Sequence, residues 1–85
     1  MKFSLVYTHR AEKDIKKLDS QIRIRVGKAL LNLQANPIGL SEMLTDPRIG
    51  TYRFRIGDYR VVFDISGNDI VVLRIGHRKE IYKRL

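Results

Sequence analysis

Apolar residues recur at helical spacing in two stretches of the first half of the chain. The first stripe consists of Ala11, Ile15 and Leu18. The second stripe consists of Ile22, Val26, Ala29, Leu30 and Leu33. Spacings of three and four residues predict two amphipathic helices, with Thr8 and Ser20 as candidate N-caps because their hydroxyls can accept a free amide hydrogen. Asn36-Pro37 ends the second helix, and the pattern predicts a helical hairpin.

Alternating apolar and polar positions predict strands on both sides of this hairpin. One strand runs over residues 2–7, and three more follow over 51–57, 59–65 and 70–75. The turn signals Gly57-Asp58 and Ser66-Gly67-Asn68 separate the last three strands and favour an antiparallel meander. Residues 77–85 are expected to form a short C-terminal helix.

The predicted fold class is therefore α+β, in the order β-α-α-β-β-β with a C-terminal helix. The helical hairpin packs on one face of a mainly antiparallel four-stranded sheet, and residues 1–85 form a single domain. Residues 37–50 form a connection that we expect Leu40, Met43 and Leu44 to hold against the core. Gly27 weakens the second helix but offers a place for close helix packing.

Composition excludes several chemistries. The chain has no cysteine, so disulfide and thiolate chemistry are excluded, and its two histidines are too far apart in sequence to predict a zinc site. We expect no metal and no cofactor. No apolar run approaches the length of about 20 residues that spans a bilayer, and the N-terminus lacks the pattern of a signal peptide. The expected location is the cytoplasm.

The charge is strongly basic and unevenly distributed. The formal net charge is +8, and seven of the nine basic residues in positions 47–85 are arginines. Arginine pairs with phosphate through a planar fork and stacks on bases. A basic domain of this kind points to a nucleic acid or an acidic protein as partner.

Strand alternation predicts where the arginines lie. Arg53 and Arg55 point away from the face that carries Tyr52, Phe54 and Ile56, and Arg60 and Val62 point the same way from the next strand. Arg78, just after the last strand, can reach the same face. Without a bound anion this cluster is unfavourable, because like charges repel. The alternative to an anion-binding site is that some of these arginines pair with Asp58 or Asp64, or that their side chains point apart into water.

Two aromatic residues near the C-terminus have a functional and a structural interpretation. Tyr82 follows Arg78 by four residues, so it either stacks on an RNA base or packs against the sheet. His77 is either a general base or a strand-end residue. Glu80 is expected to pair with Lys83 or Arg84.

Two segments resemble a known family. The sequences Tyr-Arg-Phe-Arg-Ile-Gly-Asp-Tyr-Arg-Val-Val-Phe (52–63) and Ile-Gly-His-Arg-Lys-Glu-Ile-Tyr (75–82) are similar to those of the RelE/ParE superfamily of toxin–antitoxin toxins. The resemblance implies the microbial RNase-like RelE fold. It also implies a ribosome-dependent mRNA endoribonuclease that inhibits translation. Such an enzyme cuts codons in the ribosomal A site by metal-independent attack of the ribose 2′-hydroxyl on the adjacent phosphate.

The resemblance assigns roles to five residues. Arg60 stabilises the phosphate, Arg78 assists the leaving group and Tyr82 stacks on the nucleotide, while Arg53 and Arg55 match a basic pair that is usually lysine. The expected RNA-binding residues are Arg53, Arg55, Arg60, Arg78, Tyr82 and Lys83. Arg55 stands where a lysine is the proposed base in well-studied members, and arginine cannot accept a proton. The base is then His77 or water, or Arg55 acts only by charge.

The resemblance also implies partners: a RelB-like antitoxin in a hetero-oligomer, the ribosome and mRNA. An acidic or amphipathic antitoxin segment is expected to dock across the helices and the sheet edge and to fold on binding. Two alternatives share the fold: a ParE-like inhibitor of DNA gyrase without nuclease activity, and a catalytically inactive binding module.

Overall fold

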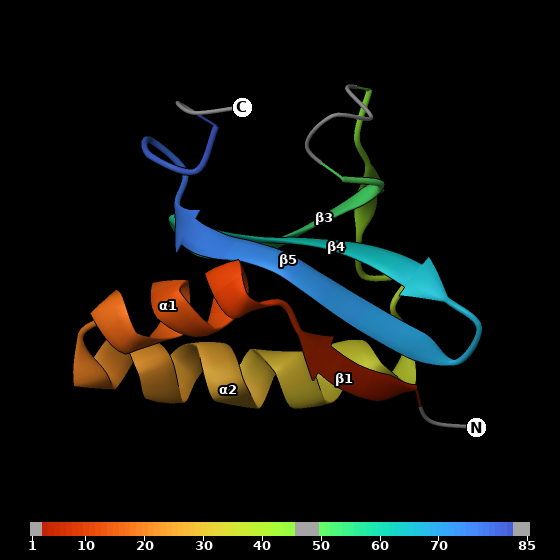
Figure 1. Cartoon of the computed structure of the whole chain (residues 1–85), viewed down its shortest axis with the longest axis horizontal. Coiled ribbons are helices and arrows are strands. Elements are labelled where there is room, and N and C mark those ends of the chain that lie inside the picture. Colours follow the sequence, from red (N-terminus) through yellow and green to blue (C-terminus); the bar gives the residue numbers. More distant parts are fainter. Residues whose placement is uncertain (1–2, 46–49, 83–85) are drawn as a thin grey trace.

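The structure, a computed structural model that describes residues 3–45 and 50–82, has two helices on one face of a five-stranded sheet (Figure 1). The helices are α1 (His9–Lys17) and α2 (Ser20–Ala35). The strands are β1 (Ser4–Tyr7), β2 (Glu42–Met43), β3 (Tyr52–Ile56), β4 (Tyr59–Ser66) and β5 (Asp69–His77). Their order in the sheet is β1-β5-β4-β3-β2, with β1 parallel to β5 and every other pair antiparallel. The predicted α+β class, helical hairpin and meander are confirmed.

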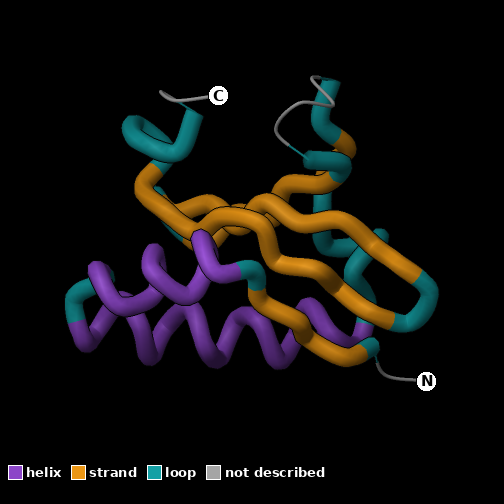
Figure 2. The backbone as a smooth tube through the Cα atoms, viewed as in Figure 1, coloured by secondary structure: helices purple, strands orange, loops and turns teal. Residues whose placement is uncertain are grey.

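Two details of the predicted topology are wrong. The sheet has a fifth strand, β2, because residues Glu42 and Met43 pair with Arg53 and Tyr52 of β3. The chain after β5 forms turns rather than a helix over 78–82, and Figure 2 shows this part as loop. His77 accepts hydrogen bonds at its carbonyl from the amides of Glu80 and Ile81, which closes a single turn. The rest of the expected helix, residues 83–85, lies outside the described residues.

The helix starts follow the sequence in one case and not in the other. The amide of Ala11 donates to Thr8 Oγ1 over 3.1 Å, as expected of an N-cap. Ser20 is not the cap of α2, because it is the first helical residue and Asp19 precedes it without a side-chain capping bond. Arg23 closes the loop between the helices instead, by donating to the carbonyl of Leu18 over 2.9 Å.

The core lies between the helices and β3–β5. The predicted helical stripes supply Ala11, Val26, Leu30 and Leu33, and the strands supply Phe54, Ile56, Val61, Phe63, Ile70, Val72 and Ile75. Burial of this apolar surface is the main source of stability in a domain of this size. None of the helices in the described ranges is long and apolar enough to cross a membrane.

The opposite face of the sheet is partly covered by the connection before β3. Val62 was expected on an open surface, but it is fully buried. A Cβ atom on Gly50 would lie 2.6 Å from Val62 Cγ1, so the Gly50 backbone packs directly on this side chain. Leu40 and Met43 do not hold the connection to the core, since they are 45% and 71% exposed, whereas Leu44 is half-buried.

Gly27 does not mediate helix packing. It is exposed, and a Cβ atom at this position would meet no atom within 4 Å. We therefore expect Gly27→Ala to raise the free energy of unfolding by about 1 kcal/mol, because alanine has the higher helix propensity. Urea unfolding followed by circular dichroism measures the change. Gly57→Ala is the matched control and should destabilise, because Gly57 has a φ of +58° and lies against Arg25.

Candidate nucleic-acid interface

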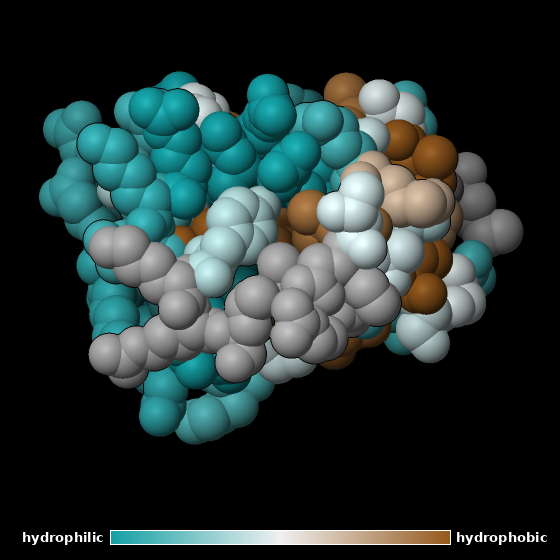
Figure 3. Space-filling model, turned by 90° about the horizontal axis from the view of Figure 1, so that it is seen from above, coloured by the Kyte–Doolittle hydropathy of each residue, from teal (hydrophilic) through white to brown (hydrophobic). Residues whose placement is uncertain are grey.

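The face of the sheet away from the helices, called here the outer face, gathers arginines from neighbouring strands. Arg55 of β3 lies directly opposite Arg60 of β4, and Arg53 lies one pair along the same ladder, opposite Val62. Residues directly opposite in an antiparallel pair share a face. The structure thus brings Arg53, Arg55 and Arg60 together. Seen from this side, hydrophilic side chains gather at one end of the molecule and hydrophobic ones at the other (Figure 3).

A carboxylate lies within this arginine group. Glu42 of β2 is the ladder partner of Arg53. Its Oε1 is 3.0 Å from Arg55 Nε, and its Oε2 accepts a hydrogen bond from Arg53 Nη2 over 3.3 Å. The sequence reasoning missed Glu42 because the two-residue strand was not recognised. Only the pairing of β2 with β3, which places Glu42 beside the two arginines, could have pointed to this residue.

The C-terminal turn folds over the outer face and brings Tyr82 to Arg53. Ile81 anchors the turn, because it is buried and lies 3.7 Å from the position of a Cβ atom on Gly76. The Tyr82 side chain, together with Glu42, raises the pKa of Arg53 above its ordinary value. The Tyr82 side chain is thus positioned beside Arg53.

Arg60 and Arg78 are both tied to the turn between β3 and β4. Arg60 Nη1 donates to the carbonyls of Gly57 and Tyr59 over 2.8 and 2.9 Å. Arg78 donates from its amide to the Asp58 carbonyl over 2.8 Å, and its Nε lies 3.6 Å from Asp58 Oδ1. Hence Arg78 approaches the strand end that carries Arg60, and each guanidinium is held in place by the same turn.

Of the two acids that the sequence offered as counter-ions, only Asp58 takes that role among the described residues. Asp64 instead accepts a hydrogen bond from the amide of Thr51 over 2.7 Å. That bond fixes the chain at the start of β3. The Arg53 and Arg55 counter-ion is Glu42, as described above.

His77 lies apart from the arginines. It is the ladder partner of Tyr59, whose ring it meets edge-on at a centroid distance of 5.4 Å. Tyr59 shares the helix side of the sheet with Val61, so His77 faces that side as well. Its Nδ1 accepts a hydrogen bond from the Lys79 amide over 3.1 Å. The structure therefore does not bring His77 to Arg55 or Arg60, and Lys83 lies outside the described residues.

A pocket of about 370 Å³ lies beside His77 rather than on the outer face. It is bounded by α1, the end of β5 and the C-terminal turn. Its lining mixes acids, bases and apolar groups, among them Lys17, Asp19 and Glu80. No group of three or more possible metal ligands occurs within residues 3–45 and 50–82.

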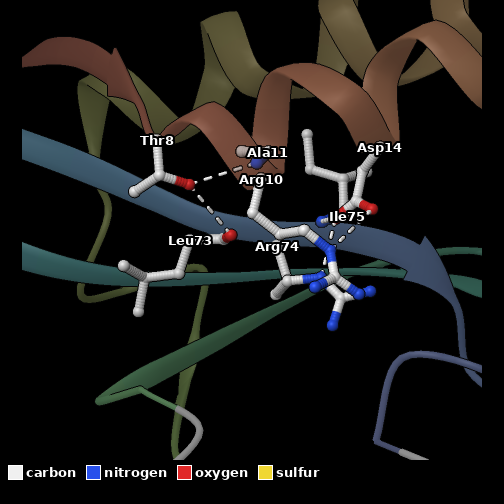
Figure 4. Close-up of polar contacts among 7 residues, drawn as sticks. All are labelled: Thr8, Arg10, Ala11, Asp14, Leu73, Arg74 and Ile75. Carbon is white, nitrogen blue, oxygen red and sulfur yellow. Dashed lines mark hydrogen bonds and ion pairs between the residues drawn. The ribbon is translucent and has the colours of Figure 1, made fainter. Parts of the chain in front are cut away.

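A second ion pair that the sequence reasoning missed fixes the end of β5. Asp14 on α1 is only 8% exposed, and its Oδ2 accepts hydrogen bonds from Arg74 Nε over 2.8 Å and from the Ile75 amide over 3.0 Å (Figure 4). Arg10 Nε lies 3.9 Å from the other oxygen. The carboxylate thus joins helix α1 to the strand that leads into Gly76.

Asp14 supplies a hydrogen-bond acceptor to the edge of β5 at Ile75, because β1 is shorter than β5 and does not reach this residue. The ladder ends where the Thr8 amide donates to the Val72 carbonyl, and Thr8 Oγ1 donates to the Leu73 carbonyl over 3.1 Å (Figure 4). Beyond this point the β5 edge has no neighbouring strand, and a buried amide without a partner is costly. The side chains of Thr8, the N-cap of α1, and of Asp14 within α1 complete the edge.

Comparison with known proteins now identifies the class. The family described as the ParE toxin of type II toxin-antitoxin systems matches residues 5–82. The chain therefore belongs to the RelE/ParE superfamily of type II toxins. Toxin RelG of Mycobacterium tuberculosis is 31% identical over 99% of this chain and all of that protein. Toxin RelE3 of Methanocaldococcus jannaschii is 32% identical over 82% of this chain and 84% of that protein.

Solved structures agree with this class and with its RelE branch. A chain of the RelBE2 toxin–antitoxin complex of Mycobacterium tuberculosis superposes with a TM-score of 0.83 at 27% identity, covering 92% of this chain and 100% of that chain. A variant of E. coli toxin RelE in the free state superposes with a TM-score of 0.78 at 25% identity, covering 96% of this chain and 92% of that chain. The chain is thus a RelE-like toxin of a toxin–antitoxin pair, with the expected RelE fold.

Proposed function

We propose that this toxin is a ribosome-dependent mRNA endoribonuclease that inhibits translation by cutting codons in the A site. The observation that carries the proposal is the group formed by Arg53, Arg55 and Arg60 on the outer face, with Tyr82 beside it. Guanidinium groups bind phosphate through charge-assisted hydrogen bonds. An aromatic ring next to them can stack on an unpaired base.

Each residue has a role in cleavage. Arg60, which the turn holds in a fixed position, stabilises the negative charge that develops on the phosphate. Arg53 and Arg55 bind the RNA backbone, and Tyr82 holds the nucleotide in line for attack. Arg78 stabilises the leaving 5′-oxygen, which takes its proton from water. The reaction needs no metal and leaves a 2′,3′-cyclic phosphate.

We further propose that Glu42 is the general base of this reaction. Arg55 cannot accept a proton, and His77 faces the other side of the sheet. The Glu42 carboxylate contacts both Arg53 and Arg55. It takes the proton of the 2′-hydroxyl while the 2′-oxygen bonds to phosphorus and the bond from phosphorus to the 5′-oxygen breaks.

Cleavage of mRNA on programmed ribosomes tests the nuclease. We expect Arg60→Ala to lower the cleavage rate by about 10²-fold or more, because one charged donor to the transition state is lost. The matched control is Lys16→Ala, a basic residue exposed on α1, which should cleave like the wild type. Unchanged cleavage by Arg60→Ala would exclude this assignment. Inhibition of gyrase supercoiling without RNA cuts would replace the nuclease by the ParE-like function.

The proposed partners follow from the same function. The solved relative from Mycobacterium tuberculosis is a toxin–antitoxin complex. We propose that this chain likewise forms a hetero-oligomer with a RelB-like antitoxin. Ribosomes and mRNA are its targets, and the cytoplasm is its place of action.

A further inference from the structure

Helix α2 contacts the turn between β3 and β4 through the side chain of Arg25. Gly57 begins this turn with a φ of +58°, a conformation that glycine adopts without strain. A Cβ atom on Gly57 would lie 2.6 Å from Arg25 Nη2, 3.1 Å from Cζ and 3.3 Å from Nη1. Three atoms of the guanidinium are close to this one point, so the group lies directly against the Gly57 backbone.

Both partners in this contact are anchored in the core. Val26, which follows Arg25, and Ile56, which precedes Gly57, belong to the same hydrophobic cluster. The start of α2 lies at the same end of the molecule as the end of β5, beside which β4 begins (Figure 1). The Arg25 side chain therefore joins the helix layer to a turn of the sheet, from backbone positions that packing holds in place.

The same turn binds the two arginines that the proposed reaction uses on the phosphate and on the leaving group. The Gly57 carbonyl accepts a hydrogen bond from Arg60 Nη1 over 2.8 Å. The Asp58 carbonyl accepts one from the Arg78 amide over 2.8 Å, and Asp58 Oδ1 lies 3.6 Å from Arg78 Nε. A displacement of this turn would therefore move both guanidinium groups.

Electrostatics argue against a purely stabilising role for Arg25. Three guanidinium groups, those of Arg25, Arg60 and Arg78, meet at one turn, and like charges repel. Arg25 is also exposed, and a substitution at such a position normally changes stability little. Sequences depart from local rules of this kind mainly at functional sites. What Arg25 does provide is a limit on where the turn can lie.

We propose that Arg25 is a positioning residue for RNA cleavage, which holds the β3–β4 turn where Arg60 and Arg78 can act on the phosphate. This inference rests on the proposed nuclease function and adds a residue of the helix layer to it. Arg25 acts from the helix side of the sheet through the Gly57 backbone, and it does not bind the RNA. Misplacing a catalytic group by about 1 Å can lower a rate by as much as about 10²-fold.

Single-turnover cleavage on programmed ribosomes tests the proposal, together with thermal unfolding and titration with a single-stranded RNA oligonucleotide. We expect Arg25→Ala to lower the cleavage rate by about ten-fold, because the turn is less well placed. The Kd for RNA should stay within about two-fold, and the Tm within about 3 °C, of the wild type. The matched control is Lys28→Ala, which removes another exposed cation of α2 and should cleave like the wild type.

Two other roles of Arg25 would give different results. A fall in Tm of about 10 °C or more with the loss of rate would indicate a structural role. A weaker Kd for RNA, with a salt dependence reduced by about one unit of slope, would indicate a direct phosphate contact. Either result would overturn the positioning role.

A double-mutant cycle shows whether Arg25 acts through Arg60. In the Arg60→Ala background, Arg25→Ala should lower the rate by only about three-fold or less, the remainder passing through Arg78. An undiminished ten-fold loss there would overturn the inference. Normal cleavage by Arg25→Ala with impaired cleavage by Arg60→Ala would overturn the positioning role alone. Normal cleavage by both variants would overturn the nuclease assignment as well.

A second cycle tests the contact itself. Gly57→Ala should lower the Tm less in the Arg25→Ala background than in the wild type, because the guanidinium that the added methyl group meets is then absent. The strain of a positive φ remains in both backgrounds. Equal losses of Tm would show that Arg25 does not lie against the turn in solution, and would overturn the inference.

Discussion

Replacing Glu42 with Gln should lower the single-turnover rate of codon cleavage by about 10²–10⁴-fold, the contribution of a positioned general base. The substitution keeps the size of the side chain and removes its ability to accept the proton. RNA binding should not weaken, because Arg53 and Arg55 lose a competing carboxylate. The measurement is cleavage on programmed ribosomes under saturating toxin, combined with a separate binding titration.

Two further variants separate catalysis from structure. Glu42→Asp should restore part of the rate, since a carboxylate base is retained at a shorter reach. His77→Gln is the matched control and should keep the wild-type rate. If His77→Gln abolishes cleavage while Glu42→Gln retains it, histidine is the base.

Replacing Asp14 with Ala should lower the free energy of unfolding by about 3 kcal/mol, which is typical of removing one partner of a buried ion pair. The change leaves the Ile75 amide and the Arg74 guanidinium without their acceptor. Water reaches Arg74, which is 22% exposed. The expected loss of stability is therefore at the lower end of the range of about 3–5 kcal/mol for breaking a buried ion pair. In a domain of this size it corresponds to a fall in Tm of about 12–24 °C.

Asp14→Asn distinguishes the hydrogen bond from the charge. An asparagine oxygen can still accept from the Ile75 amide, so this variant should lose less stability than Asp14→Ala. In a double-mutant cycle, Arg74→Met combined with Asp14→Ala should cost less than the sum of the single changes. Strict additivity in thermal unfolding would show that the two side chains are not coupled.

Much of the fold was predictable because each element carries a local signal. The stripe at Ala11 and the stripe ending at Leu33 have helical spacing, and the alternation around Phe54 and Val61 has strand spacing. The missed strand, β2, has only two residues, too few for a period to be seen. The expected C-terminal helix does not form over the described residues, because Ile81 is buried against Gly76 at the end of β5 and the chain between them bends into a turn.

The candidate site was only partly predictable for a related reason. Alternation along β3 and β4 placed Arg53, Arg55 and Arg60 on one face, since that depends on neighbours in sequence. The positions of Glu42 and Arg74 could not be predicted in this way, because they depend on contacts between segments distant in sequence. Glu42 depends on the pairing of β2 with β3, and Arg74 depends on the contact of α1 with β5. The sequence left His77 as either a general base or a strand-end residue, because the side it faces depends on the pairing of β5 with β4, where it lies opposite Tyr59.

The carboxylates of Glu42 and Asp58 have a consequence for the dependence of RNA affinity on salt. They already lie against Arg53, Arg55 and Arg78, so these cations do not each hold a mobile ion from solution. RNA phosphates that bind there displace tethered acids, and fewer ions are released than the number of arginines would suggest. The logarithm of the binding constant should therefore fall with the logarithm of salt concentration less steeply than one unit of slope per arginine.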